Sequence, residues 1–86
     1  MTTRNRQAEV RARAGCVALT VSRETGTLAG IYRAALADMD VDGRWAVVCE
    51  DHGTLVGVDS LVMARAAAAH PTEFCDDCRA AQAAGR

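Results

Sequence analysis

Cys49-Glu50-Asp51-His52-Gly53 separates two apolar runs, and this short stretch decides how the chain folds. The preceding run, Arg44-Trp45-Ala46-Val47-Val48, and the following run, Thr54-Leu55-Val56-Gly57-Val58, are both rich in the β-branched residues typical of strands. The segment between them is too short for anything but a turn. Residues 44–58 therefore predict a β-hairpin with Cys-x-x-His-Gly at its tip.

A second pair of the same spacing, Cys75-x-x-Cys78, follows the hairpin in sequence. Pairs of this kind are typical of zinc sites. In a tight turn, Cys49 and His52 can point at one ion, with Gly53 relieving the backbone just after them. On a helix, Cys75 and Cys78 share one face. Three thiolates and one imidazole make a closed tetrahedral site, so we expect one structural Zn²⁺ held by Cys49, His52, Cys75 and Cys78.

Two further residues could replace a member of this set. Cys16 could act as a ligand, although its apolar surroundings favour a small core residue. His70 could take the place of His52, although a solvated histidine in the last turn of a helix is the simpler interpretation. A redox pair formed by Cys75 and Cys78 is a third alternative. An iron–sulfur cluster is a fourth, and such clusters usually use four cysteines.

The amino-terminal half contains one clear strand and one ambiguous segment. Residues 16–21 predict a strand with Val17, Leu19 and Val21 on one face. Apolar residues in 28–36 recur at the helical period, so this segment predicts a helix. Gly30 weakens that interpretation, and a strand through 28–32 is the alternative.

The carboxy-terminal third predicts two helices. Asp59 or Ser60 would cap a helix over 61–69, and Pro71 would end it. Thr72 would cap a last helix from Glu73 to about residue 84. We also expect Trp45 and Phe74, two of only three aromatic residues, to pack together in the core beside the metal.

The length of 86 residues allows one small domain. Hydrophobic residues make up 50% of the chain, but many of them are alanine, so the core is poor in large side chains. Small scaffolds of this kind often depend on a metal or a disulfide. We therefore predict an α+β fold of the zinc-ribbon or treble-clef kind, in which a hairpin knuckle packs on carboxy-terminal helices. Residues 1–14 would form an arginine-rich arm or short helix, and residues 15–86 a single zinc-binding domain.

Composition and motifs limit the function. Because there is no long apolar run and no signal peptide, we expect a cytoplasmic protein with no membrane segment. With a net charge of −1, the chain as a whole is not a polycation that binds nucleic acid through its charge alone. No catalytic motif is readable in the sequence, so we expect no enzyme activity.

Three functions remain open. The first is a non-enzymatic interaction module that binds another protein, and the second is a nucleic-acid-binding accessory protein. The third is a thiol redox sensor, and a homo-oligomer is compatible with each of them. The arginines that could contact nucleic acid in the second case are Arg4, Arg6, Arg11 and Arg13.

The chain also resembles small uncharacterised zinc-binding proteins of actinobacteria and their phages, over roughly residues 31–79. The resemblance is specific at the two ligand pairs and the tryptophan. It implies that the two pairs hold the metal, and it implies no activity. The residues that carry it are Gly43-Arg44-Trp45-x-Val47-x-Cys49-x-x-His52-Gly53-Thr54-Leu55-Val56, then Ala64-Arg65, then Pro71-x-x-Phe74-Cys75-x-x-Cys78-Arg79.

Overall fold

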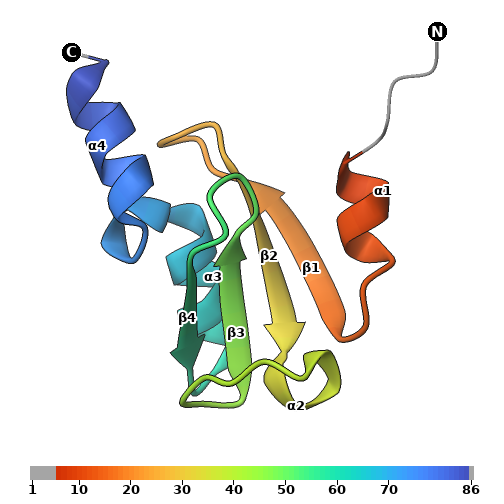
Figure 1. Cartoon of the computed structure of the whole chain (residues 1–86). Helices are drawn as coiled ribbons and strands as arrows, with labels where there is room; N and C mark the ends of the chain where they lie inside the picture. The colour runs from red at the N-terminus through yellow and green to blue at the C-terminus, as the bar shows by residue number, and fades with distance from the viewer. Residues whose placement is uncertain (1–5, 86) are drawn as a thin grey trace, which may run out of the picture.

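A computed structural model describes residues 6–85 of the chain. It has an α+β fold in which one antiparallel sheet carries helices on both faces (Figure 1). The strands are β1 (Cys16–Val21), β2 (Leu28–Arg33), β3 (Trp45–Cys49) and β4 (Leu55–Val58). The helices are α1 (Arg6–Arg11), α2 (Ala34–Ala37), α3 (Leu61–Ala69) and α4 (Asp76–Ala84), with a 3₁₀ turn over Pro71–Glu73.

The sheet is a meander with the order β1-β2-β3-β4, so every strand pairs with its neighbour in sequence. The predicted hairpin is confirmed: β3 and β4 pair antiparallel, with Val47 opposite Val56. Its turn lies at the same end of the sheet as α4, whereas α2 lies at the opposite end (Figure 1). Gly53 has a φ of 80°, which is the left-handed backbone that glycine adopts without strain.

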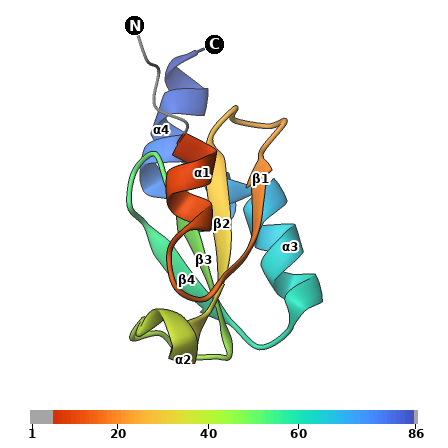
Figure 2. The same cartoon turned by 90° about the vertical axis from the view of Figure 1, so that its right-hand side faces the viewer.

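Each face of the sheet has its own apolar cluster, because side chains alternate along a strand. On one face, Tyr32 and Ala46 pack with Val10 of α1. On the other, Ile31 and Val47 pack with the buried alanines of α3. Figure 2 shows α1 and α3 on opposite sides of the strands. Val10 is only 3% exposed, so α1 is packed onto the domain.

The predicted helix over 28–36 is wrong, and the alternative strand is correct. Strand β2 occupies Leu28–Arg33, and only Ala34–Ala37 is helical. Because β2 is an inner strand that is buried on both faces, its apolar residues do not alternate with polar ones. Their spacing therefore coincided with the helical period. Gly30 leaves room for the Glu50 side chain, because a Cβ at position 30 would lie only 2.6 Å from Oε2 of Glu50 and would collide with it.

The strand over 16–21 is confirmed, but its predicted apolar face is not. The pairing between β1 and β2 shifts between Cys16 and Ala18, which is a β-bulge. Val17 is 47% exposed and Val21 is 50% exposed, whereas Leu19 packs on the α1 side of the sheet. Strand β1 is an edge strand, so part of its apolar surface stays in contact with solvent.

The helix over 61–69 is confirmed, with Ser60 as its cap. The Ser60 hydroxyl accepts a hydrogen bond from the Met63 N–H at 3.1 Å. The last helix starts later than predicted, because Cys75 and not Thr72 is its N-cap. The hydroxyl of Thr72 instead donates to Glu24 at 2.6 Å.

Trp45 and Phe74 both pack against the α3-side cluster, as partly buried residues. The prediction that Trp45 lies beside the metal is wrong. Trp45 begins β3 and Cys49 ends it, so the two residues lie at opposite ends of that strand. Phe74 does pack against the buried cysteines.

Candidate metal centre

Four side chains from two distant parts of the chain meet at the end of β3 and the start of α4. They are Cys49, His52, Cys75 and Cys78, and their ligand atoms all lie within 4.8 Å of one another. The three cysteines are buried free thiols, while the His52 side chain is exposed at the rim. The structure thus brings together the four residues predicted as ligands, and this group could hold a metal ion.

The distances within the cluster fit a tetrahedral ion. Sγ of Cys49 and Sγ of Cys78 are 3.6 Å apart. The His52 Nδ1 lies 3.3 Å from Sγ of Cys49 and 3.4 Å from Sγ of both Cys75 and Cys78. An ion with metal–sulfur bonds of about 2.3 Å and a metal–nitrogen bond of about 2.0 Å would place tetrahedral sulfurs about 3.8 Å apart and sulfur and nitrogen about 3.5 Å apart. The geometry therefore identifies Nδ1 as the ligand atom of His52.

The hairpin turn positions the first pair through its own backbone. The Cys49 carbonyl accepts hydrogen bonds from the N–H of His52 at 3.2 Å and of Gly53 at 2.6 Å. The Cys49 N–H donates to the carbonyl of Thr54 at 2.7 Å, which closes the turn. This tight loop turns the thiol and the imidazole toward the same point.

The start of α4 positions the second pair. Sγ of Cys75 accepts from the N–H of Cys78 at 3.5 Å, so the sulfur serves as the helix cap. The amino end of a helix carries partial positive charge, which favours thiolates. The end of the helix therefore favours the ionised form of the capping sulfur of Cys75.

Two threonine hydroxyls complete the surroundings of the sulfurs. Thr54 lies 3.4 Å from Sγ of Cys75, and Thr27, in the turn between β1 and β2, lies 3.6 Å from Sγ of Cys78. Groups of this kind orient metal ligands and tune their charge. Neither threonine was identified from the sequence: Thr27 is far from both ligand pairs along the chain, and Thr54, although two residues after His52, contacts the cysteine of the other pair.

Burial alone would raise the pKa of Cys75, but hydrogen bonds from Thr54, from the Cys78 N–H and from the neighbouring thiols lower that pKa to about 7. Burial raises the pKa of Cys78 to about 12, and the nearby thiols of Cys49 and Cys75 add to the increase although Thr27 opposes it. A dication among the sulfurs would favour the thiolate form of each. Metal binding would therefore release protons, and it would weaken as the pH falls.

A buried carboxylate lies directly after the first ligand. The Glu50 side chain is 3% exposed, and it accepts from the Tyr32 hydroxyl at 2.6 Å and from the Arg13 guanidinium at 2.9 Å. The Glu50 N–H also donates to the carbonyl of Leu28 at 2.8 Å. Burial, followed by the contact with Glu50, raises the pKa of Tyr32. These contacts connect the metal-site turn to β2 and to the segment after α1.

The alternative ligands lie elsewhere. Cys16 packs on the α1-side cluster, where burial raises the pKa of its thiol. His70 faces Glu24, with its Nδ1 3.3 Å from the carboxylate. Neither belongs to the group of four.

The arginines predicted to contact nucleic acid are in different situations. Arg11 is exposed at the end of α1, and Arg13 is paired with Glu50. Arg4 lies outside the described residues, and so does the side chain of Arg6.

Comparisons with protein-family models, with curated proteins and with solved structures find no match to this chain. The resemblance to small zinc-binding proteins therefore stays an expectation, and the metal centre is supported by its geometry. In the part of the chain that the structure describes, no helix is long and apolar enough to cross a membrane.

Proposed function

We propose that this chain is a small, non-enzymatic interaction module in which a single zinc ion is structural. One observation carries the proposal: three buried thiols and one imidazole converge from the β3–β4 turn and from the start of α4. An ion there would join the last helix to the sheet. The surface of the domain, rather than the metal, would then bind a partner protein.

The donor set favours zinc over other metals. Thiolate ligands are soft, and tetrahedral sites built from sulfur and nitrogen are typical of zinc. Calcium and magnesium prefer oxygen ligands in larger coordination shells. Iron–sulfur clusters usually use four cysteines, whereas one of the four groups here is a histidine.

The number of donors supports a structural role. Catalytic zinc sites have three protein ligands and leave a position for water or substrate. Here four protein ligands would fill a tetrahedral shell, and three of them are buried. Free thiols that bind metal also suit a reducing compartment, in keeping with a cytoplasmic location.

Cobalt substitution would test the structural role. Tetrahedral Co²⁺ bound by thiolates has intense visible absorption bands, which shift when a ligand is exchanged. We expect one Co²⁺ per chain with a thiolate-rich tetrahedral spectrum. We also expect that spectrum to stay unchanged when azide or free imidazole is added, because no coordination position is open.

His52→Ala and His70→Ala form the matched pair for this test. The first should change the cobalt spectrum or open it to azide, and the second should leave the spectrum as it is. A wild-type spectrum that responds to azide would contradict the closed site and would favour a catalytic metal.

A further inference from the structure

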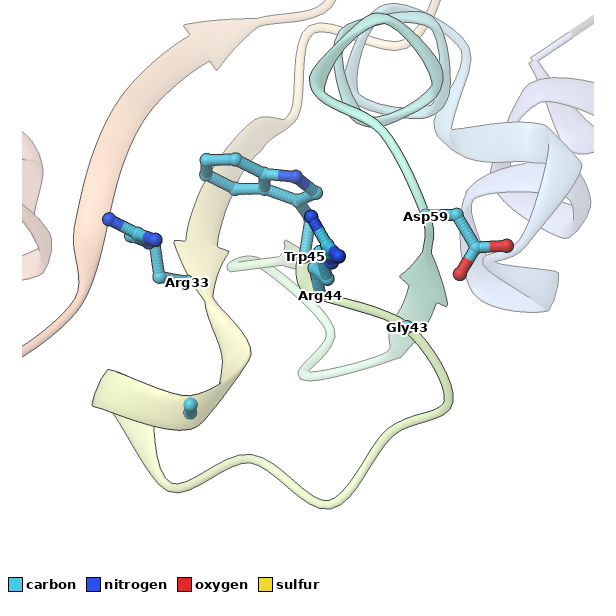
Figure 3. A pocket seen from close by; sticks show the side chains of 6 residues that line it. Arg33, Gly43, Arg44, Trp45 and Asp59 are labelled. Carbon is cyan, nitrogen blue, oxygen red and sulfur yellow. The ribbon is translucent and has the colours of Figure 1, made fainter.

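A pocket lies at the end of the sheet away from the Cys/His cluster. It has a volume of about 460 Å³, within the size range of small binding sites. Figure 3 shows its charged and aromatic side chains, which come from β2, from the start of β3 and from the segment between β4 and α3. The pocket is lined by Arg33, Ala35, Gly43, Arg44, Trp45 and Asp59.

Trp45 is a partly buried wall of this pocket. Its indole packs against the α3-side cluster, which holds the ring in place. Arg33 is its direct partner across the β2–β3 pair, and the Arg33 guanidinium lies 5.7 Å from the centre of the ring. Contacts of this kind between a cation and an aromatic face are attractive. The tryptophan therefore presents a fixed apolar surface beside a positive charge.

The two arginines are available to a ligand. Arg33 and Arg44 are both exposed, and across residues 6–85 neither guanidinium forms an ion pair with a carboxylate. Guanidinium groups match carboxylates and phosphates through paired hydrogen bonds. Two of them around one indole favour an anionic group attached to an apolar one.

The backbone that carries these side chains is fixed. The Ala34 N–H donates to the carbonyl of Arg44 at 3.0 Å, which joins the two arginine-bearing segments. Gly43 has a φ of 114°, and a Cβ there would collide with the carbonyl oxygen of Val58. The loop thus lies directly against β4. The backbone of the pocket therefore needs little rearrangement when a ligand binds.

The negative charges around the pocket decide between classes of ligand. Asp59 lines the pocket, and the adjoining loop carries three exposed acids, Asp38, Asp40 and Asp42. A nucleic acid has a regular row of phosphates, which these acids would repel. A peptide can place acidic side chains opposite Arg33 and Arg44 alone, and basic ones opposite the aspartates.

We propose that this pocket docks an acidic segment of a partner protein. Carboxylates of the segment would bind Arg33 and Arg44, and an aromatic or long aliphatic side chain would lie against Trp45. Tryptophan and arginine are the residues that most often dominate binding at protein interfaces. The inference rests on the proposed function as an interaction module and supplies the chemistry of its partner.

In the test, peptides that bind the zinc-loaded full chain are selected from a random-peptide display library. We expect the enriched peptides to contain Asp or Glu beside an aromatic or long aliphatic residue, with Lys or Arg at positions that can face the surrounding aspartates. A synthetic peptide from this set should change the emission of Trp45, which is the only tryptophan in the chain. The double variant Arg33→Gln/Arg44→Gln should weaken binding at least about tenfold, as expected for central interface residues.

The control is Arg11→Gln/Arg23→Gln, which removes the same charge from exposed arginines outside the pocket and should leave the affinity unchanged. Peptides without acidic enrichment, no enriched peptide at all, or equal affinity in both double variants would each overturn the proposal. So would oligo-dT binding that depends on Arg33 and Arg44, which would make the surface a nucleic-acid site.

If the chain keeps its zinc and its fold but selects no acidic peptide, only the proposed role of this pocket is overturned. A cobalt spectrum that responds to azide would instead overturn the proposal that the zinc ion is structural. The two failures are therefore distinguishable.

Discussion

Tyr32 is the residue whose ionisation most directly reports on the interior of the domain. It is fully buried, its hydroxyl donates to Glu50, and it is the only tyrosine in the chain. Ionising it would place a second negative charge beside a buried carboxylate. Burial and that carboxylate together raise its pKa above the ordinary value of 10.0.

Titration of the tyrosinate absorption band should show this increase. We expect the folded, zinc-loaded protein to show no tyrosinate as the pH passes 10, whereas urea-unfolded protein should titrate near about pH 10. Because the folded state keeps its proton longer, the stability from this group is complete below the unfolded pKa and declines as the pH rises above it. Coincident titration curves for folded and unfolded protein would show that Tyr32 is not buried beside Glu50.

The cysteines allow a comparison between a ligand and a non-ligand of the same type. Cys78→Ser should abolish tight zinc binding, because a neutral hydroxyl replaces a thiolate in a four-ligand shell. Cys16→Ser should keep one zinc per chain, since Cys16 lies outside the cluster. Zinc content by native mass spectrometry measures both. Retention of zinc by the first variant, or its loss in the second, would assign the ligands differently.

The residue types and spacing of the metal ligands could be recognised from sequence, because a local turn and a helix start each set the geometry of one pair. Their surroundings could not. Glu50 is held by Arg13 and Tyr32, and Thr27 reaches Cys78 from another turn. These contacts depend on how the strands pair and on where the turns and helices lie around the sheet, and no short sequence motif encodes them.

At the scale of elements, the segments that are correctly predicted are those with local signals. The β3–β4 hairpin has two apolar runs rich in β-branched residues around a short turn that contains glycine, and α3 has a cap and a proline. Strand β2 is predicted as a helix because burial on both faces removes the alternation typical of a strand, and β2 lacks the run of β-branched residues that identifies β3. The start of α4 was misplaced because the capping group is the thiol of Cys75, whereas Thr72 has the more familiar capping side chain.

The cap of α3 yields a prediction at this scale. Ser60→Ala removes the acceptor for the Met63 N–H and should lower the free energy of unfolding by about 1 kcal/mol. Ser60→Thr keeps a hydroxyl at the same position and should cost only a few tenths of a kcal/mol. Urea unfolding of the zinc-loaded variants measures both values. Equal stability of the alanine and threonine variants would contradict the capping role.

At the scale of the whole molecule, the Cys/His cluster lies between parts that make few other contacts, and a metal ion there would join them. Within residues 6–85, Phe74 is the one partly buried hydrophobic residue that packs against the cysteine cluster, whereas the two faces of the sheet have their own larger clusters. Structural zinc contributes an apparent 10–16 kcal/mol or so in small modules. That is comparable to the whole stability of a typical domain, about 5–15 kcal/mol. The fold should therefore depend on the ion.

The dependence of the fold on zinc is tested most directly by titrating the metal-free chain with zinc while far-ultraviolet circular dichroism is recorded. We predict that the metal-free protein lacks a cooperative thermal transition. We also predict that the signal of the sheet and helices reaches its full value at one equivalent of Zn²⁺. A metal-free chain that already has this signal and unfolds cooperatively, with no change on adding zinc, would contradict the account.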